Sequence, residues 1–270
     1  MPCLYAHHTF GQKVRSLLPE EMQECISTYE EQFNLGLQGP DFLFYFRPLG
    51  KNPINRLGHR IHKKSGAFYI RKVLPIVSRK GQYSPETAYL LGFLCHFMLD
   101  SKCHPYVEKK VEESGIGHVD MEGEFDKFLM KKDGIRPETY PLWKHIPVDL
   151  LTVQTLHYLY PWIKKRHAVA SLYSFRFCKW LLTAQNRVKK HLLIALMKTV
   201  GLYQKLRGHY LWDETLEGSE PISIGLYIRY EEEIEKAAAM EQSLWKLIGE
   251  KGKGKLSPRL SVNFSGHQVM

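Results

Sequence analysis

The sequence predicts an all-α protein that folds as a single-domain bundle of helices. Apolar residues recur at helical spacing along most of the chain, and no alternating pattern is long enough to predict a substantial strand. With 270 residues, of which 44% are hydrophobic, the chain can bury one large core. We therefore expect one helical domain over residues 1–250, followed by a flexible basic linker and C-terminal tail over residues 251–270.

The N-terminal part of the chain predicts two helices, and the first carries two adjacent histidines. An apolar-periodic segment follows His7 and His8, and Ala6 beside His7 favours His7 as the residue that faces the interior. A second helix is expected from Leu18 to about Asn34, because acidic residues fill its first turn as the helix dipole prefers.

A turn and a short helical segment with further polar residues come next. A Gly-Pro pair breaks the second helix directly before Asp41, which then opens a strongly apolar run. An aspartate at a helix start is most often a cap, although it can also be a metal ligand. His59 and His62 are three residues apart, so one can point inward while the other faces solvent, and the neighbouring Ile61 favours His62. Residues 66–78 are predicted to form the next helix.

The central segment carries polar residues on the apolar face of a helix. A hydroxyl N-cap followed by proline starts this helix at Ser84, and Pro105 is expected to end it. His96, Asp100 and His104 follow at intervals of four residues, so they project from one stripe that is otherwise apolar. Because a lone ionised carboxylate is costly to bury, we expect a cation to meet Asp100.

A second histidine and carboxylate pair follows on the next predicted helix. His118 and Glu122 are again four residues apart, and imidazole and carboxylate together are the ligands that zinc takes. A buried polar network without metal is the alternative, but so many such groups on apolar helices favour a metal. Cys103 shares the stripe of Asp100 and is an alternative soft ligand. We therefore expect the helices to surround a polynuclear zinc cleft.

The C-terminal half predicts helices and little chemistry. Residues 148–165 are apolar and aromatic with a break at Pro161, residues 171–206 read as one long helix, and residues 226–247 read as another. Several remaining histidines are interpreted as ordinary core or surface residues: His145, His157, His167, His191, His209 and His267.

Charge and cysteine content narrow the choice of partner and compartment. The chain has 38 Lys and Arg against 28 Asp and Glu, a net charge of +10, which favours anionic partners such as phosphate esters or acidic lipids. Nucleic acid is less favoured, because the basic clusters are not interleaved with aromatic residues. Five irregularly spaced cysteines, and an N-terminus without a secretory pattern, lead us to expect a cytoplasmic protein.

The order and local spacing of the polar set resemble the bacterial zinc-dependent phospholipase C family, which shares a helical fold with zinc single-strand nucleases. The resemblance covers roughly residues 1–135 and is nearest to a cytoplasmic branch of the family. It implies three zinc ions. One would be held by Asp41, His62, His96 and Asp100, a second by His104, His118 and Glu122, and a third by His7, Asp100 and the N-terminus. It further implies that Asp100 bridges two ions and that Asp41 activates the attacking water.

The resemblance and the chemistry of the ligands together predict a phosphodiester hydrolase of phospholipase C type. Three carboxylates and two to three zinc ions leave a cationic cleft that can take a phosphate anion, and zinc lowers the pKa of bound water to about 7, so a metal-bound hydroxide forms at neutral pH. A phospholipid headgroup is the favoured substrate, which would bring the protein into peripheral contact with a membrane. A nuclease-like phosphodiesterase and a zinc-stabilised binding or scaffold protein are the alternatives.

Overall fold

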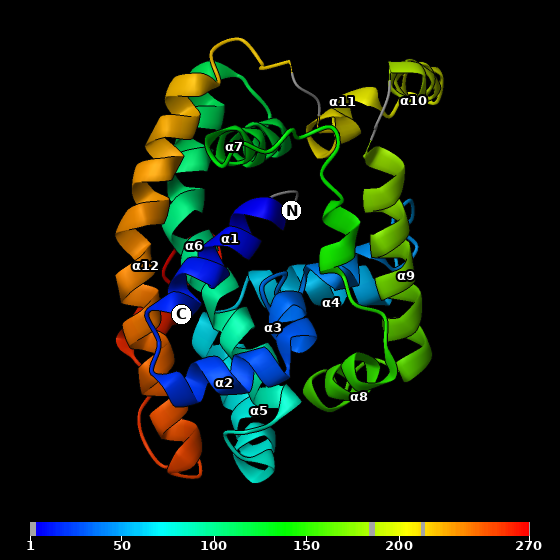
Figure 1. The fold of residues 1–270 in the computed structure, drawn as a ribbon. Helices are drawn as coiled ribbons and strands as arrows, with labels where there is room; N and C mark the ends of the chain where they lie inside the picture. The colour runs from blue at the N-terminus through cyan, green and yellow to red at the C-terminus, as the bar shows by residue number, and fades with distance from the viewer. Residues whose placement is uncertain (1–3, 184–186, 212–213, 270) are drawn as a thin grey trace.

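The computed structural model describes residues 4–183, 187–211 and 214–269, and the regular elements in these ranges are helices (Figure 1). An isolated bridge pairs Val262 with Gln268. The α-helices and 3-10 helices (η) are, in chain order, α1 (Leu4–Ser16), α2 (Glu20–Thr28), α3 (Glu30–Gly36), η1 (Asp41–Tyr45), α4 (Pro53–His62), α5 (Gly66–Lys80), α6 (Pro85–Ser114), α7 (His118–Lys132), η2 (Leu142–His145), α8 (Leu150–Leu159), α9 (Lys165–Leu182), α10 (Arg187–Thr199), α11 (Tyr203–Leu206), η3 (Arg207–His209), α12 (Glu220–Gly249) and η4 (Pro258–Ser261). The all-α prediction is confirmed.

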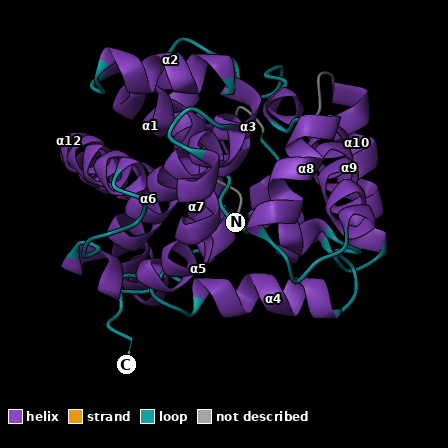
Figure 2. Ribbon diagram, turned by 90° about the horizontal axis from the view of Figure 1, so that it is seen from below, coloured by secondary structure: helices purple, strands orange, loops and turns teal. Residues whose placement is uncertain are grey.

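Helix α6 is the central element of the bundle. It begins as the sequence predicts, because the Ser84 side chain accepts a hydrogen bond from the Thr87 N–H and Pro85 occupies the first turn. Helices α1, α3, α5, α7, α8 and α12 all pack against it, so its first half is buried on nearly every side. Figures 1 and 2 both place α6 and α12 on the side of the molecule opposite α8, α9 and α10.

Pro105 does not end α6, and this prediction was wrong. The helix continues to Ser114, where Gly115 closes it in a left-handed conformation. A proline inside a helix removes the hydrogen bond to the carbonyl four residues earlier, which here belongs to Ser101. That carbonyl faces the C-terminal segment so closely that a Cβ on Gly266 would lie 2.5 Å from it.

Two predicted long helices are divided in the structure. The helix expected over residues 18–34 breaks at Tyr29, and α3 starts afresh with Glu30 and Glu31 in its first turn, where the helix dipole favours carboxylates. The helix expected over residues 171–206 becomes α9, α10 and α11. Gly201 takes a left-handed conformation directly after α10 and so separates it from α11.

The C-terminal segment, predicted as a tail outside the helical domain, packs into the core. Leu260 and Phe264 are both buried, and the Phe264 ring contacts Phe93 and Phe97 of α6 edge to face. The Phe264 N–H donates to the carbonyl of His62 over 3.3 Å, which ties the segment to the end of α4. Residues after position 250 therefore contribute side chains to the same apolar core as the helices.

Candidate metal centre

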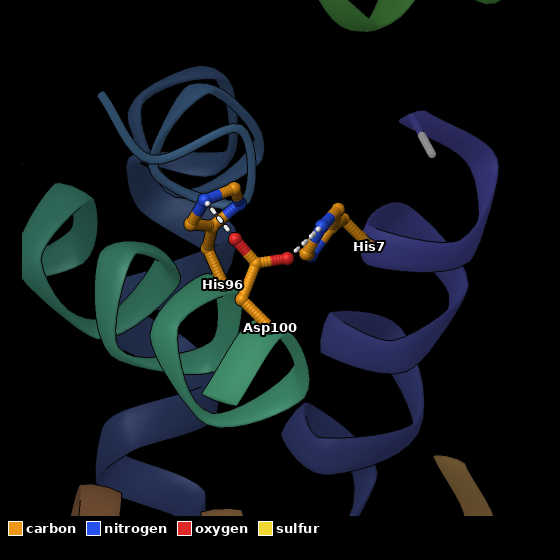
Figure 3. A group of neighbouring side chains, drawn as sticks. All are labelled: His7, His96 and Asp100. Atoms are coloured by element: carbon orange, nitrogen blue, oxygen red, sulfur yellow. Dashed lines mark ion pairs between the residues drawn. The ribbon is translucent and has the colours of Figure 1, made fainter. Parts of the chain in front are cut away.

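Helix α6 presents the buried side chains of His96 and Asp100, and α1 brings His7 to them. Asp100 Oδ2 lies 3.2 Å from His96 Nε2, and Asp100 Oδ1 lies 3.2 Å from His7 Nε2. Figure 3 shows the carboxylate between the two imidazoles, one from each helix. The rings of His7 and His96 stack with centroids 4.2 Å apart. The predicted spacing on α6 thus places one carboxylate where two elements meet.

The start of α1 is fixed by a buried carboxylate that the sequence analysis did not single out. Asp126 of α7 accepts hydrogen bonds from the backbone N–H groups of Tyr5 over 3.2 Å and Ala6 over 2.8 Å. These are among the amides that a helix leaves without a partner in its first turn. Burial raises the pKa of Asp126 to about 7, although both N–H bonds oppose the rise. Asp126 therefore sets the position of the turn that carries His7.

The structure separates the two adjacent histidines of α1. His7 is buried against Asp100. The His8 ring faces another side of α1, where its centroid lies 4.0 Å from that of the His145 ring. His145 in turn lies 2.9 Å from the Tyr140 hydroxyl through its Nε2. The residue that reaches the candidate centre is therefore His7.

Asp41 and His62 form the second part of the centre. Asp41 is the first residue of η1, after Pro40 in the N-cap position, and its side chain is buried. Its Oδ1 lies 3.0 Å from His62 Nε2, at the end of α4. Burial would raise the pKa of Asp41, but the positive charges around it, including those of His62 and His96, hold it below its ordinary range. His59, the alternative, is exposed and lies against Phe44.

His96 is held by the turn that follows α3. Its Nδ1 lies 3.2 Å from the carbonyl oxygen of Leu37, and a Cβ on Gly39 would lie 2.3 Å from its ring. Gly39 has a φ of +52°, a conformation that favours glycine. The close approach of α3 to α6 depends on Gly36 and Gly92, because a Cβ on either glycine would come within 2.2 Å of a backbone carbonyl on the facing helix.

His104, His118 and Glu122 form the third part, between α6 and α7. Glu122 Oε1 lies 3.1 Å from His104 Nε2 and 3.0 Å from His118 Nε2, and His104 Nε2 lies 3.6 Å from Asp100 Oδ1. Burial would raise the pKa of Glu122, but its contacts with His104 and His118 lower it to about 2. Asp100 therefore links this part of the centre to the first.

Three of the histidines are oriented by backbone carbonyls. Each has its Nδ1 within 3.2 Å of a carbonyl oxygen, which leaves Nε2 directed at the carboxylates; the pairs are His62 with Gly58, His96 with Leu37, and His104 with Phe264. Metal-binding histidines characteristically donate their second ring N–H in this way, which fixes the tautomer and the ring. The carbonyl of Phe264 comes from the segment that the sequence analysis placed outside the domain.

The geometry of the whole set fits several metal ions. Three groups have ligand atoms within 4.8 Å of one another: His7 with His96 and Asp100, Asp41 with His62 and His96, and His104 with His118 and Glu122. Two ligands of one tetrahedral zinc ion, each about 2.1 Å away, are about 3.4 Å apart, which matches the separations above. Apart from the 3.2 Å contact between them, His96 Nε2 and Asp100 Oδ2 are buried and make no hydrogen bond within the part of the chain that the structure describes, as is typical of atoms that bind a cation. Cys103 belongs to none of these groups.

One histidine interpreted as ordinary lies beside the centre. His209 ends η3, which packs on α7 so closely that a Cβ on Gly123 would lie 2.1 Å from the Gly208 carbonyl. Burial, helped by the charge of Lys179, lowers the pKa of His209 to about 3, while the negative charge of Glu122 opposes the shift. No local spacing links residue 209 to the motifs near residue 120, so only the fold reveals this neighbour.

Comparison with known families agrees with the geometry. A family model described as zinc dependent phospholipase C matches residues 6–175, a range that contains all eight candidate ligands and most of the bundle around them. Comparison with curated proteins and with solved structures finds no match. Because the family model covers more than half of the chain, the protein belongs to the zinc-dependent phospholipase C family.

Proposed function

We propose that this protein is a zinc-dependent phosphodiester hydrolase of phospholipase C type, with a centre of two to three zinc ions. The observation that carries the proposal is the convergence of eight buried or half-buried His, Asp and Glu side chains with their Nε2 and carboxylate oxygens directed at one another. Membership of the family supports both the metal and the class of reaction.

The proposed ligands divide as the three groups of the structure do. One ion would be held by Asp41, His62, His96 and Asp100. A second ion would be held by His104, His118 and Glu122, and a third would take His7 and Asp100 as ligands. Asp100 is suited to bridge two ions, because its two oxygens face different histidines. The side chain of His118 is 36% exposed and that of His62 is 15% exposed, whereas the side chains of the other six proposed ligands are at most 6% exposed. Substrate would therefore approach on the side of His118 and His62.

The protein residues around the proposed ions supply orientation and a proton acceptor. Zinc bound there would lower the pKa of a water ligand to about 7 and stabilise negative charge on a phosphodiester. Asp41 is kept ionised by its neighbours, so its carboxylate can accept a proton from an attacking water at neutral pH. The backbone carbonyls that fix His62, His96 and His104 keep the ligand set in place during the reaction.

The substrate test compares three classes of phosphodiester on zinc-loaded protein. We expect hydrolysis of bis-nitrophenyl phosphate and of diacyl phospholipids, with phosphatidylcholine-type headgroups preferred over single-stranded DNA. Asp41→Ala should abolish the hydrolysis while it removes at most one zinc per chain. His59→Ala is the control and should retain full activity, because His59 is exposed outside the centre. Activity on none of these substrates at full zinc occupancy would leave a zinc-stabilised scaffold as the function.

We also propose that the protein works in the cytoplasm. What supports this is that the thiols of Cys25, Cys95, Cys103 and Cys178 are free, as expected in a reducing compartment. Among the described residues, none of the helices combines the length and the hydropathy needed to cross a bilayer. Fractionation of cells that express a tagged chain tests the proposal, and recovery of the protein from outside the cell would overturn it.

A further inference from the structure

Helices α9 and α10 expose an apolar surface that the proposed reaction does not use. We call it the α9–α10 stripe, and its side chains are between 47% and 69% exposed: Tyr173, Phe177 and Trp180 on α9, Val188, Leu192 and Leu196 on α10, and Val200 directly after it. Isolated exposed apolar residues are common on proteins, but six on two successive helices, with a seventh directly after the second helix, mark a surface for interaction.

The stripe follows the helical period on each of the two helices. Its members recur at intervals of three or four residues, so they share one face of each helix. Leu193 and Met197, on a neighbouring face of α10, are buried against Tyr210, so α10 packs on the protein while the stripe stays exposed. Lys189 of α10 contacts Trp180 of α9. Its Nζ lies 4.8 Å from the centroid of the Trp180 ring and donates a hydrogen bond to the Trp180 carbonyl over 3.0 Å.

The segment that carries the stripe is strongly cationic. Residues 150–212 contain eleven Lys and Arg and not one Asp or Glu, so this part of the sequence holds a positive charge as large as the net +10 of the whole chain. Exposed Arg166 lies seven residues before Tyr173, on the same face of α9, and Lys189 of α10 contacts the Trp180 ring. An apolar helical face bordered by cations is the pattern of helices that lie in a membrane interface.

We propose that the α9–α10 stripe docks on the surface of a bilayer that contains anionic lipids. The aliphatic side chains and the Trp and Tyr would enter the interface, while the cations would meet lipid phosphates. A second copy of the chain is a poorer occupant, because pairing this face with itself would oppose two clusters of like charge. Single-stranded nucleic acid is also poorer, because half of the stripe is aliphatic and offers no ring on which bases stack.

The inference rests on the proposed function and deepens it, because docking would present the substrate as a lipid surface.

The opposite side of α9 packs on the element that carries Asp41. Phe175 of α9 stacks on Tyr45 of η1 with ring centroids 3.9 Å apart and an angle of 13°. A helix docked on the bilayer would therefore lie in direct contact with the element that begins at the candidate centre.

Vesicle binding by matched double variants tests the proposal. The variant Leu192→Gln with Leu196→Gln removes two stripe residues four apart, and Ile224→Gln with Ile228→Gln removes two comparably exposed residues four apart on α12, on the opposite side of the molecule (Figure 1). Glutamine preserves helix propensity in both. Co-sedimentation is measured with phosphatidylcholine vesicles with and without phosphatidylglycerol, and circular dichroism confirms that each variant is folded.

We expect the natural chain to bind vesicles that contain phosphatidylglycerol, to bind pure phosphatidylcholine more weakly, and to be released by salt. The stripe variant should bind about tenfold more weakly or worse, and the α12 variant should bind like the natural chain. Both variants should hydrolyse soluble bis-nitrophenyl phosphate at the natural rate, which separates failure of docking from failure of the proposed reaction. Equal binding by the two variants, a stripe-dependent dimer in solution, or stripe-dependent binding of single-stranded DNA in place of vesicles would overturn the proposal.

Discussion

The Asp100 carboxylate connects the parts of the candidate centre at the scale of single residues. Its Oδ1 faces His7 and His104, and its Oδ2 faces His96. Burial would raise the pKa of this carboxyl, but the charges of His104 and His96 hold it well below the ordinary range. A carboxylate kept ionised in the core in this way can bind cations on both of its oxygens.

Replacing Asp100 with asparagine tests this role. We expect Asp100→Asn to lose at least one zinc ion per chain and about 3 kcal/mol or more of stability, because the histidines around it would lose their anionic partner. Zinc content by elemental analysis and urea unfolding measure the two effects. His59→Ala should change neither, and equal effects from the two substitutions would contradict the assignment of the centre.

Glu241 of α12 is a buried carboxyl away from the candidate centre. It is fully buried and accepts a hydrogen bond from the Cys95 thiol of α6 over 2.8 Å. Burial raises its pKa to about 8, despite the bond from Cys95. Because the folded-state pKa lies above the unfolded value of about 4.3, the stability that Glu241 contributes is fully present below pH 4 and is lost as the pH rises through 8.

Glu241→Gln should therefore stabilise the protein more at high pH than at low pH. The gain over the natural chain should be small at pH 5 and should reach about 2 kcal/mol or more at pH 8.5, because glutamine has no proton to lose. Urea unfolding in the presence of chelator measures the gain without a contribution from zinc. Glu235→Gln, an exposed position on the same helix, is the control. A difference between Glu241→Gln and the natural chain that does not change with pH would contradict the account.

At the scale of elements, the contact between α3 and α6 positions the histidine that two ligand groups share. Gly36 and Gly92 let the two backbones approach, and the turn after α3 then presents the Leu37 carbonyl to His96. The close approach of two glycines thus orients a side chain one turn farther along α6.

Gly92→Ala should disturb both packing and metal binding. Its Cβ would lie 2.2 Å from the Phe33 carbonyl, so α3 would have to move away from α6, at a cost of about 1–3 kcal/mol. Displacing Leu37 should also weaken zinc binding through His96. Unfolding in chelator and competition for zinc with a fluorescent indicator measure the two consequences. Gly50→Ala is the matched control, because a Cβ there would meet nothing within 4 Å, and an effect as large as that of Gly92→Ala would contradict this account.

The local parts of the centre were predictable from the sequence, because their spacing belongs to single helices. His96, Asp100 and His104 share one face of α6, and His118 and Glu122 share one face of α7, as a period of 3.6 residues requires. The partners that orient these side chains were not predictable. Asp126 fixes α1 from a distance of 120 residues in the chain, and Phe264 reaches His104 over 160 residues.

The fold class followed from periodicity, whereas the ends of several elements did not. Pro105 was expected to end α6, but the helix continues to Ser114, with His104 before the proline and Val107 after it both buried. The C-terminal segment has few apolar residues, so composition favoured a tail. Leu260 and Phe264 nevertheless bring the segment into the core.

At the scale of the whole molecule, the candidate centre lies where segments far apart in the chain meet. Ligands come from α1, η1, α4, α6 and α7, and the C-terminal segment adds a carbonyl. Unfolding would separate all of these segments, so metal bound at the centre should stabilise the entire bundle and not one helix.

The most direct test is the zinc content of the purified chain, measured by elemental analysis after removal of loosely bound metal. We expect at least two zinc ions per chain, together with a fall in melting temperature when a chelator removes them. Less than one zinc ion per chain, with a melting temperature that the chelator does not change, would show that these residues form a buried polar network without metal, and would contradict the account.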